Sequence, residues 1–266
     1  MRKFLMTLLI MGAIQWTTMA GATAATVIRE DFSRYFDGLT GAFVLYEPAT
    51  DTYRIYNEEQ SNKRLSPCSS FKIFNSLIGL ETGVLDRNDT LTLMPWDGTH
   101  YDTAGWNRDH TLASATRESV VWYFQALARR IGAERMQLYL DRIGYGNRDI
   151  SGGLTRFWLR SSLQISAMEQ VDVLKRLYAG ELPFSAESRA IVLQNITLAN
   201  ENGIKFMGKT GSGYQDGKWI FGWFVGYIET QGKVYVFATN VEGADEASGV
   251  KAREITRRIA KELGLL

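Results

Sequence analysis

Segments typical of β-strands lie at both ends of this 266-residue chain, and segments typical of helices fill its middle. The first two β-rich runs, TGAFVLYEPAT and TYRIYNEEQ, are joined by the turn residues Pro48 and Asp51 and are expected to form a hairpin. Three further runs, IKFMGKTGSG, WIFGWFVGYIE and KVYVFATNVE, succeed one another directly near the end of the chain. This direct succession favours antiparallel pairing over crossover connections.

The middle segments ESVVWYFQALARRIG, AERMQLYLDRIG and SAMEQVDVLKRLYAG each have apolar residues three to four positions apart and end in glycine. The C-terminal segment ASGVKAREITRRIAKELG repeats this pattern and is expected to cover one sheet face. The sequence therefore predicts an α+β fold in a single domain, residues 25–266. An antiparallel sheet lobe is built from about 25–64 and 201–266 and flanked by helices, an all-helical lobe is inserted at about 65–200, and the site lies between the lobes.

The N-terminus has the pattern of a secretory signal peptide. Arg2 and Lys3 precede the apolar run FLMTLLIMGAI and the small-residue stretch AGATAA, which predicts cleavage after Ala22 or Ala24 and a periplasmic or secreted protein. The run is shorter than the ~20 residues of a membrane span, so no anchor is expected. Without residues 1–24 the chain has 28 basic (30 − 2) and 29 acidic residues, which argues against nucleic acid or anionic membranes as partners.

Two kinds of site are not favoured by the sequence. Cys68 is the only cysteine, so no internal disulfide can form, and a small buried hydrophobic role is favoured over a reactive thiol. His100 and His110 lie near Asp102 and Asp109, but their spacing matches no recognised ligand set, so no metal is expected.

The stretch LSPCSSFKIFNSLIGLETG, residues 65–83, is expected to enter a helix at its proline and to end at its last glycine. Ser69 and Lys72 are i and i+3 on this helix and share a face. A neighbouring amine can take the proton of a serine hydroxyl, so Ser69 is the candidate nucleophile and Lys72 its base. The S-x-x-K pattern also occurs at Ser248–Lys251, and a solvated lysine on an exposed face remains an alternative.

Further motifs follow in order along the chain: SVV at Ser119–Val121, YGN at Tyr145–Asn147, FWL at Phe157–Leu159 and KTG at Lys209–Gly211. An S-x-x-K serine with a downstream K-T-G is the pattern of penicillin-recognising enzymes. With PCSSFK in place of S-T-F-K, the chain resembles the class D, oxacillinase-type serine β-lactamases over essentially all of its mature part. A class A enzyme would need S-D-N and a separate glutamate base.

The resemblance implies a role for each matched residue. Ser69 would attack the lactam carbonyl, its N–H and that of Ser212 would receive the oxyanion, and Ser119 would pass a proton to the lactam nitrogen. The substrate-binding residues it implies are Lys209, Thr210, Gly211 and Ser212.

The resemblance also implies that carbon dioxide carboxylates Lys72, giving a carbamate base. No other cofactor is implied. Trp158 would donate its indole N–H to the carbamate and Val121 would be one of the residues around it, although core filling remains an alternative for Trp158. Trp106 could line the site or belong to the core.

The family often supplies a C-terminal arginine to the substrate carboxylate. The expected position falls near Ala252, which leaves Lys251 or Arg253 as imperfect substitutes.

The resulting prediction is hydrolysis of β-lactam antibiotics through a serine acyl-enzyme, with a β-lactam as the small-molecule partner. A β-lactam-sensing domain or a cell-wall D-alanyl-D-alanine peptidase remains an alternative, and an oligomer is possible. A Ser-His-Asp triad would leave Lys72 and Lys209 without roles.

Overall fold

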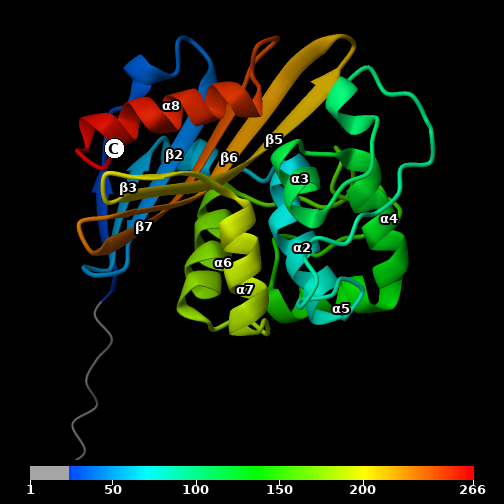
Figure 1. The fold of residues 1–266 in the computed structure, drawn as a ribbon. Helices are drawn as coiled ribbons and strands as arrows, with labels where there is room; N and C mark the ends of the chain where they lie inside the picture. Colours follow the sequence, from blue (N-terminus) through cyan, green and yellow to red (C-terminus); the bar gives the residue numbers. More distant parts are fainter. Residues whose placement is uncertain (1–23) are drawn as a thin grey trace, which may run out of the picture.

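The computed structural model describes residues 24–266, and its centre is a seven-stranded sheet in the order β1-β3-β2-β7-β6-β5-β4 (Figure 1). The strands are β1 (Thr26–Arg29), β2 (Thr40–Glu47), β3 (Thr52–Tyr56), β4 (Thr197–Glu201), β5 (Ile204–Gln215), β6 (Lys218–Thr230) and β7 (Lys233–Glu242). Every pair of neighbouring strands from β3 across the sheet to β4 is antiparallel, as predicted. The pair at the edge, β1 with β3, is parallel. Pairing of β2 with β7 joins the two ends of the chain in one sheet.

Helices cover both faces of this sheet (Figure 1). They are α1 (Glu58–Asn62), α2 (Lys72–Glu81), α3 (Leu112–Arg117), α4 (Val121–Ile131), α5 (Ala133–Ile143), α6 (Ala167–Ala179), α7 (Ala186–Asn195) and α8 (Gly249–Glu262), with 3₁₀ turns η1 (Ser33–Tyr35), η2 (Cys68–Phe71) and η3 (Ala104–Trp106). The predicted C-terminal helix is α8, which packs across one face. The helical lobe lies against the other face.

Alternation of side chains along the strands divides the core in two. On β2, Phe43 and Leu45 belong to the cluster under α8, whereas Val44 and Tyr46 belong to the cluster shared with the helical lobe. Strands β6 and β7 show the same alternation, because successive side chains of a strand point to opposite faces. The sheet is therefore apolar on both faces, and the candidate site lies where β5 meets the helical lobe.

Three expectations about the elements need correction. The helix predicted for residues 65–83 starts as the turn η2 and becomes α-helical only at Lys72. Strand β4 falls inside the range assigned to the helical lobe, because Thr197 already pairs with β5. The helix α1 lies inside the range assigned to the sheet lobe.

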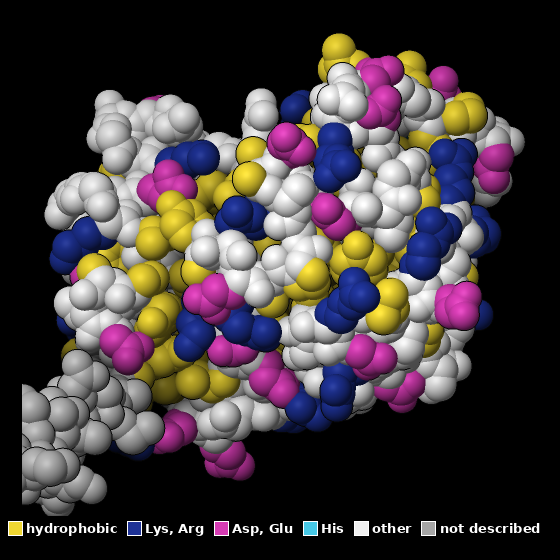
Figure 2. Space-filling view, turned by 90° about the horizontal axis from the view of Figure 1, so that it is seen from below, with side chains coloured by type: hydrophobic (Ala, Val, Ile, Leu, Met, Phe, Trp, Pro, Cys, Tyr) yellow, Lys and Arg dark blue, Asp and Glu magenta, His cyan; other side chains and the backbone are white. Residues whose placement is uncertain are grey.

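The predicted leader lies outside the described residues, apart from its last position. Within residues 24–266, no helix is both long and apolar enough to cross a membrane. On the face seen in Figure 2, acidic and basic side chains are interspersed, with hydrophobic side chains between them.

Candidate active site

The candidate nucleophile lies in the turn η2, directly before α2. Cys68, the residue before it, has a left-handed φ of 48°, a strained backbone geometry that recurs at functional sites. Ser69 is half-buried, whereas Ser70 is buried and its Oγ donates to Pro67 O at 2.8 Å and accepts from Gln170 Nε2 at 3.1 Å. Of the two adjacent hydroxyls, Ser69 is therefore the one available to a ligand.

The thiol of Cys68 is buried, and burial raises its pKa to about 11. A thiol with so high a pKa is almost wholly protonated at neutral pH and is a poor nucleophile. This agrees with the small hydrophobic role expected for Cys68.

Two buried lysines meet at one serine hydroxyl. Lys72 Nζ donates to Ser119 O at 2.5 Å and to Ser119 Oγ at 3.0 Å, and Lys209 Nζ donates to the same Oγ at 3.0 Å. Lys72 is fully buried, and Lys209 is 5% exposed. The structure thus brings together Lys72 from α2, Ser119 from the loop before α4 and Lys209 from β5, and Ser69 lies in η2, directly before α2.

The surroundings favour the neutral form of both amines. Burial, and then the nearby charge of Lys209, hold the pKa of Lys72 well below its ordinary value. Burial, and then the charge of Arg253, lower the pKa of Lys209 to about 7. Neither lysine has an ion-pair partner in the described part of the chain. This environment therefore favours the neutral amine of Lys72, which is the form that a base requires.

Ser119 is held by an irregular turn between α3 and α4. It has a left-handed φ of 56°, and its N–H donates to Thr116 O at 3.3 Å. Trp106 Nε1 donates to Glu118 O at 3.0 Å, so this tryptophan braces the turn from the preceding loop. Val121 is half-buried at the first position of α4.

Trp158 is fully buried and packs against Phe71, the residue before Lys72, with ring centroids 6.0 Å apart. Its Nε1 has no hydrogen-bond partner among the described residues. Leaving a buried N–H unpaired costs about 1–3 kcal/mol, so this atom indicates that an acceptor is missing beside it. An anionic group on the Lys72 amine would be a suitable hydrogen-bond acceptor for this N–H.

Ser66 is a further residue of the site, and the sequence reasoning did not assign it a role. Its Oγ donates to Trp158 O at 2.9 Å and accepts from Arg160 N at 3.0 Å. Its carbonyl accepts from Trp223 Nε1 at 2.9 Å. Ser66 therefore ties the segment of Trp158 to the chain just before the nucleophile and to the sheet.

Replacing Ser66 by alanine is expected to lower the free energy of unfolding by about 1–3 kcal/mol, because it leaves the buried Trp158 carbonyl and Arg160 N–H unpaired. Urea denaturation followed by circular dichroism measures this change. Ser161→Ala, in the same segment but without a side-chain hydrogen bond in the structure, is the control and should change stability little. Equal effects of the two substitutions would contradict the bridging role of Ser66.

The backbone of β5 lies directly against the nucleophile turn. A Cβ atom on Gly211 would lie 2.5 Å from Pro67 O and 3.2 Å from Ser69 N. On the other side, a Cβ on Gly249 at the start of α8 would lie 2.6 Å from Gly211 O. Three backbone segments thus stack at distances that only glycine permits.

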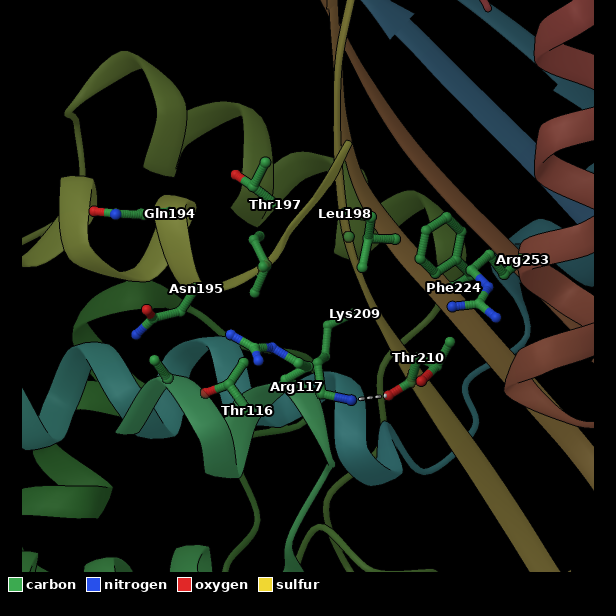
Figure 3. Close-up of a pocket in the computed structure, with 13 residues that line it drawn as sticks. Thr116, Arg117, Gln194, Asn195, Thr197, Leu198, Lys209, Thr210, Phe224 and Arg253 are labelled. Carbon is green, nitrogen blue, oxygen red and sulfur yellow. Dashed lines mark hydrogen bonds between the residues drawn. The ribbon is translucent and has the colours of Figure 1, made fainter. Parts of the chain in front are cut away.

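The side chain of Ser212 faces α8, because its Oγ accepts from Gly249 N at 2.9 Å. Thr210 and Lys209 line a cavity together with Arg253 (Figure 3). Lys251 points elsewhere and is paired with Asp37 at 2.9 Å. Of the two alternatives left open by the sequence, Arg253 is the one that lines a cavity with Lys209 and Thr210 of β5.

The histidines do not join the site. His110 is buried, its ring nitrogens lying 2.9 Å from Ser114 Oγ and 3.0 Å from Gly105 O, and it has a structural role. His100 lies on the surface. Residues 24–266 contain no group of three or more histidine, cysteine, aspartate or glutamate side chains placed to hold a metal ion.

Comparison with known proteins agrees with this geometry. The penicillin-binding protein transpeptidase domain family matches residues 41–261. The probable β-lactamase YbxI of Bacillus subtilis is 44% identical over 231 residues, which are 87% of this chain and 84% of that protein. A crystal structure of a class D β-lactamase from Bacillus subtilis superimposes with a TM-score of 0.84 at 43% identity, covering 89% of this chain and 97% of that one.

The regulatory protein BlaR1 of Bacillus licheniformis is 40% identical over 238 residues, which are 89% of this chain but only 39% of that protein. The chain belongs to the penicillin-binding transpeptidase family and is a class D serine β-lactamase-like member of the penicillin-recognising superfamily.

Proposed function

We propose that the protein hydrolyses β-lactams through an ester on Ser69, with Lys72 as the general base. The observation that carries this proposal is the fully buried Lys72 amine, whose pKa is held low and which is bonded to Ser119. A hydrolase needs a base for two steps, and no carboxylate in the described residues bonds to Lys72, Lys209 or Ser119.

In acylation, Ser69 Oγ attacks the lactam carbonyl carbon and its proton passes to the base at Lys72. The lactam C–N bond breaks, and Ser119 gives its proton to the departing nitrogen. Because Ser119 Oγ lies 3.0 Å from both lysine nitrogens, it can be reprotonated from either. Lys209, Thr210 and Arg253 would bind the substrate carboxylate.

Deacylation requires a base that can activate water, and we propose that Lys72 is N-carboxylated by carbon dioxide for this purpose. Only a neutral amine reacts with carbon dioxide, and the low pKa of Lys72 provides one. The carbamate would supply an anionic oxygen as the base. Trp158 Nε1, buried and without a partner, is the donor that would hold it.

Incubation with a penicillin is expected to add the mass of the drug to Ser69, located by peptide mass spectrometry, and a chromogenic cephalosporin should be turned over many times per protein molecule. Ser69→Ala should abolish both results, and Ser161→Ala should preserve them. An adduct on Ser70 or Cys68 would contradict the assigned nucleophile.

A β-lactam sensor is the second candidate function, supported by the 40% identity to the regulatory protein BlaR1. A sensor and a hydrolase share acylation and differ in how long the ester survives. Turnover near one per second and an ester lasting hours differ by about four powers of ten, or ~5.5 kcal/mol. A single stoichiometric burst in the same assay, without further turnover, would therefore favour the sensor.

A further inference from the structure

The cavity beside Lys209 and Thr210 has a volume of about 250 Å³ (Figure 3). Arg117 from α3, Lys209 from β5 and Arg253 from α8 all line it. Gln194 and Asn195, at the end of α7, form part of its far wall. The cavity thus brings two arginines and one lysine together from three separate elements, and the two guanidinium groups carry its positive charge.

No acidic residue balances this charge in the lining of the cavity. The side chains of Arg117 and Arg253 have no ion pair and no hydrogen bond with any residue between 24 and 266. The acid next to Arg117 in sequence, Glu118, is paired with Arg108 instead. Ionised groups that lack a partner in a shared concave site attract anions from solvent.

One carboxylate does not account for the whole cavity. Under the proposed function, Lys209, Thr210 and Arg253 bind the single carboxylate of a simple β-lactam. In Figure 3 the guanidinium of Arg117 lies between Asn195 and Lys209, on the side of Lys209 away from Arg253. Arg117 and the amide of Asn195 therefore remain without a ligand.

We propose that Arg117 and Asn195 form a second anion subsite, distal to the carboxylate subsite. Its ligand is an oxyanion: either the second acidic group of a dianionic β-lactam, carried on the carbon next to the one that bears the carboxylate, or a free inorganic oxyanion. Arg117 supplies the charge and the amide N–H groups supply neutral donors. Binding of a dianionic β-lactam at this subsite rests on the proposed function, whereas binding of a free inorganic oxyanion does not.

The first test uses sulfate, which does not titrate near neutral pH, and the full chain without substrate. Titration of the ¹⁵N-labelled protein with sodium sulfate, at an ionic strength kept constant with sodium chloride, should give saturable NMR shifts confined to the cavity. Arg117→Gln should weaken sulfate binding about five- to tenfold. Arg130→Gln is the matched control, since Arg130 is also exposed and has no ion pair among the described side chains.

Two results would overturn the subsite: sulfate shifts scattered over the surface, or equal affinities of Arg117→Gln and the wild type. The amide NMR spectrum of Arg117→Gln shows whether the variant is folded, so a folding defect is not mistaken for lost sulfate binding. Because this test involves no β-lactam, it is independent of whether the protein hydrolyses one.

The second test distinguishes the two sources of the anion. Two cephalosporins that differ only in an acidic or neutral C3 substituent are compared by kcat/KM, or by acylation rate if no turnover occurs. For a substrate-borne anion, Arg117→Gln should lower the acidic-to-neutral ratio about fivefold, and Arg130→Gln should not change it. Sulfate binding with an unchanged ratio would restrict the subsite to free oxyanions and overturn the dianionic-substrate form.

Discussion

Replacing Lys72 by alanine is expected to lower kcat/KM for a chromogenic cephalosporin about 10⁴-fold, the upper end of the contribution of one general base. The size of the effect follows from the position of Lys72, three residues after Ser69, and from the absence of any carboxylate bonded to Lys72, Lys209 or Ser119 in the described residues. Stopped-flow measurement should show that acylation and deacylation both slow.

Lys175→Ala is the control for this experiment. Lys175 is another helical lysine, half-buried where Lys72 is fully buried, and its Nζ donates to Tyr53 Oη at 2.9 Å and not to a residue of the candidate site. Its replacement should leave kcat/KM near the wild-type value. A Lys72→Ala variant that retains a tenth or more of wild-type activity would show that another group takes the proton.

The second large effect on the reaction rate is expected from replacing Trp158. Trp158→Phe keeps most of the packing against Phe71 but removes the unpaired indole N–H. A hydrogen bond to a charged group contributes about 1.5–3 kcal/mol, so the variant should deacylate about 10- to 100-fold more slowly while acylation changes less. Mass spectrometry should then show the ester on Ser69 accumulating during turnover.

Bicarbonate distinguishes a lost carbamate donor from a packing defect. Burial lowers the pKa of Lys72 and so favours its neutral amine, whereas acidification through that pKa should protonate the amine and release carbon dioxide. Wild-type activity should therefore fall on acidification and return with added bicarbonate, and Trp158→Phe should need more bicarbonate than the wild type.

Trp96→Phe, whose indole N–H already donates to Thr99 O at 2.8 Å, should behave as the wild type in the same bicarbonate series. A wild-type rate indifferent to bicarbonate after acid treatment, together with normal turnover by Trp158→Phe, would leave Lys72 a simple amine base.

The sequence predicted the sheet from both chain ends because strand and helix periodicities differ so strongly in these segments. It did not predict β1 or β4, since four- and five-residue strands at the sheet edges are too short to show a period. Within the site, local spacing was sufficient to relate Ser69 to Lys72. The resemblance assigned Lys72, Ser119 and Lys209 to one site, but it did not predict that both lysines bond to the hydroxyl of Ser119, because that contact depends on tertiary packing.

Two features could not be derived from local sequence. Ser66 has an ordinary context, and its role depends on Trp158, Arg160 and Trp223, which the fold brings from distant positions. The choice of Arg253 over Lys251 depends on the rotation of α8, which directs Lys251 to Asp37. Both are consequences of packing geometry and not of residue pattern.

The close packing of the three backbone segments at Pro67, Gly211 and Gly249 affects the order in which parts of the chain fold. Pro67, Gly211 and Gly249 come from the first third, the last third and the final helix of the chain, and their backbones touch with no side chain between them. During synthesis the segment of Ser69 emerges long before β5 and α8 exist. Contacts between such distant segments form late, because closing the intervening chain is entropically costly. The candidate site is therefore completed at the end of folding, and a nascent chain that still lacks its C-terminal helix would contain Ser69 without the backbone surface that packs behind it.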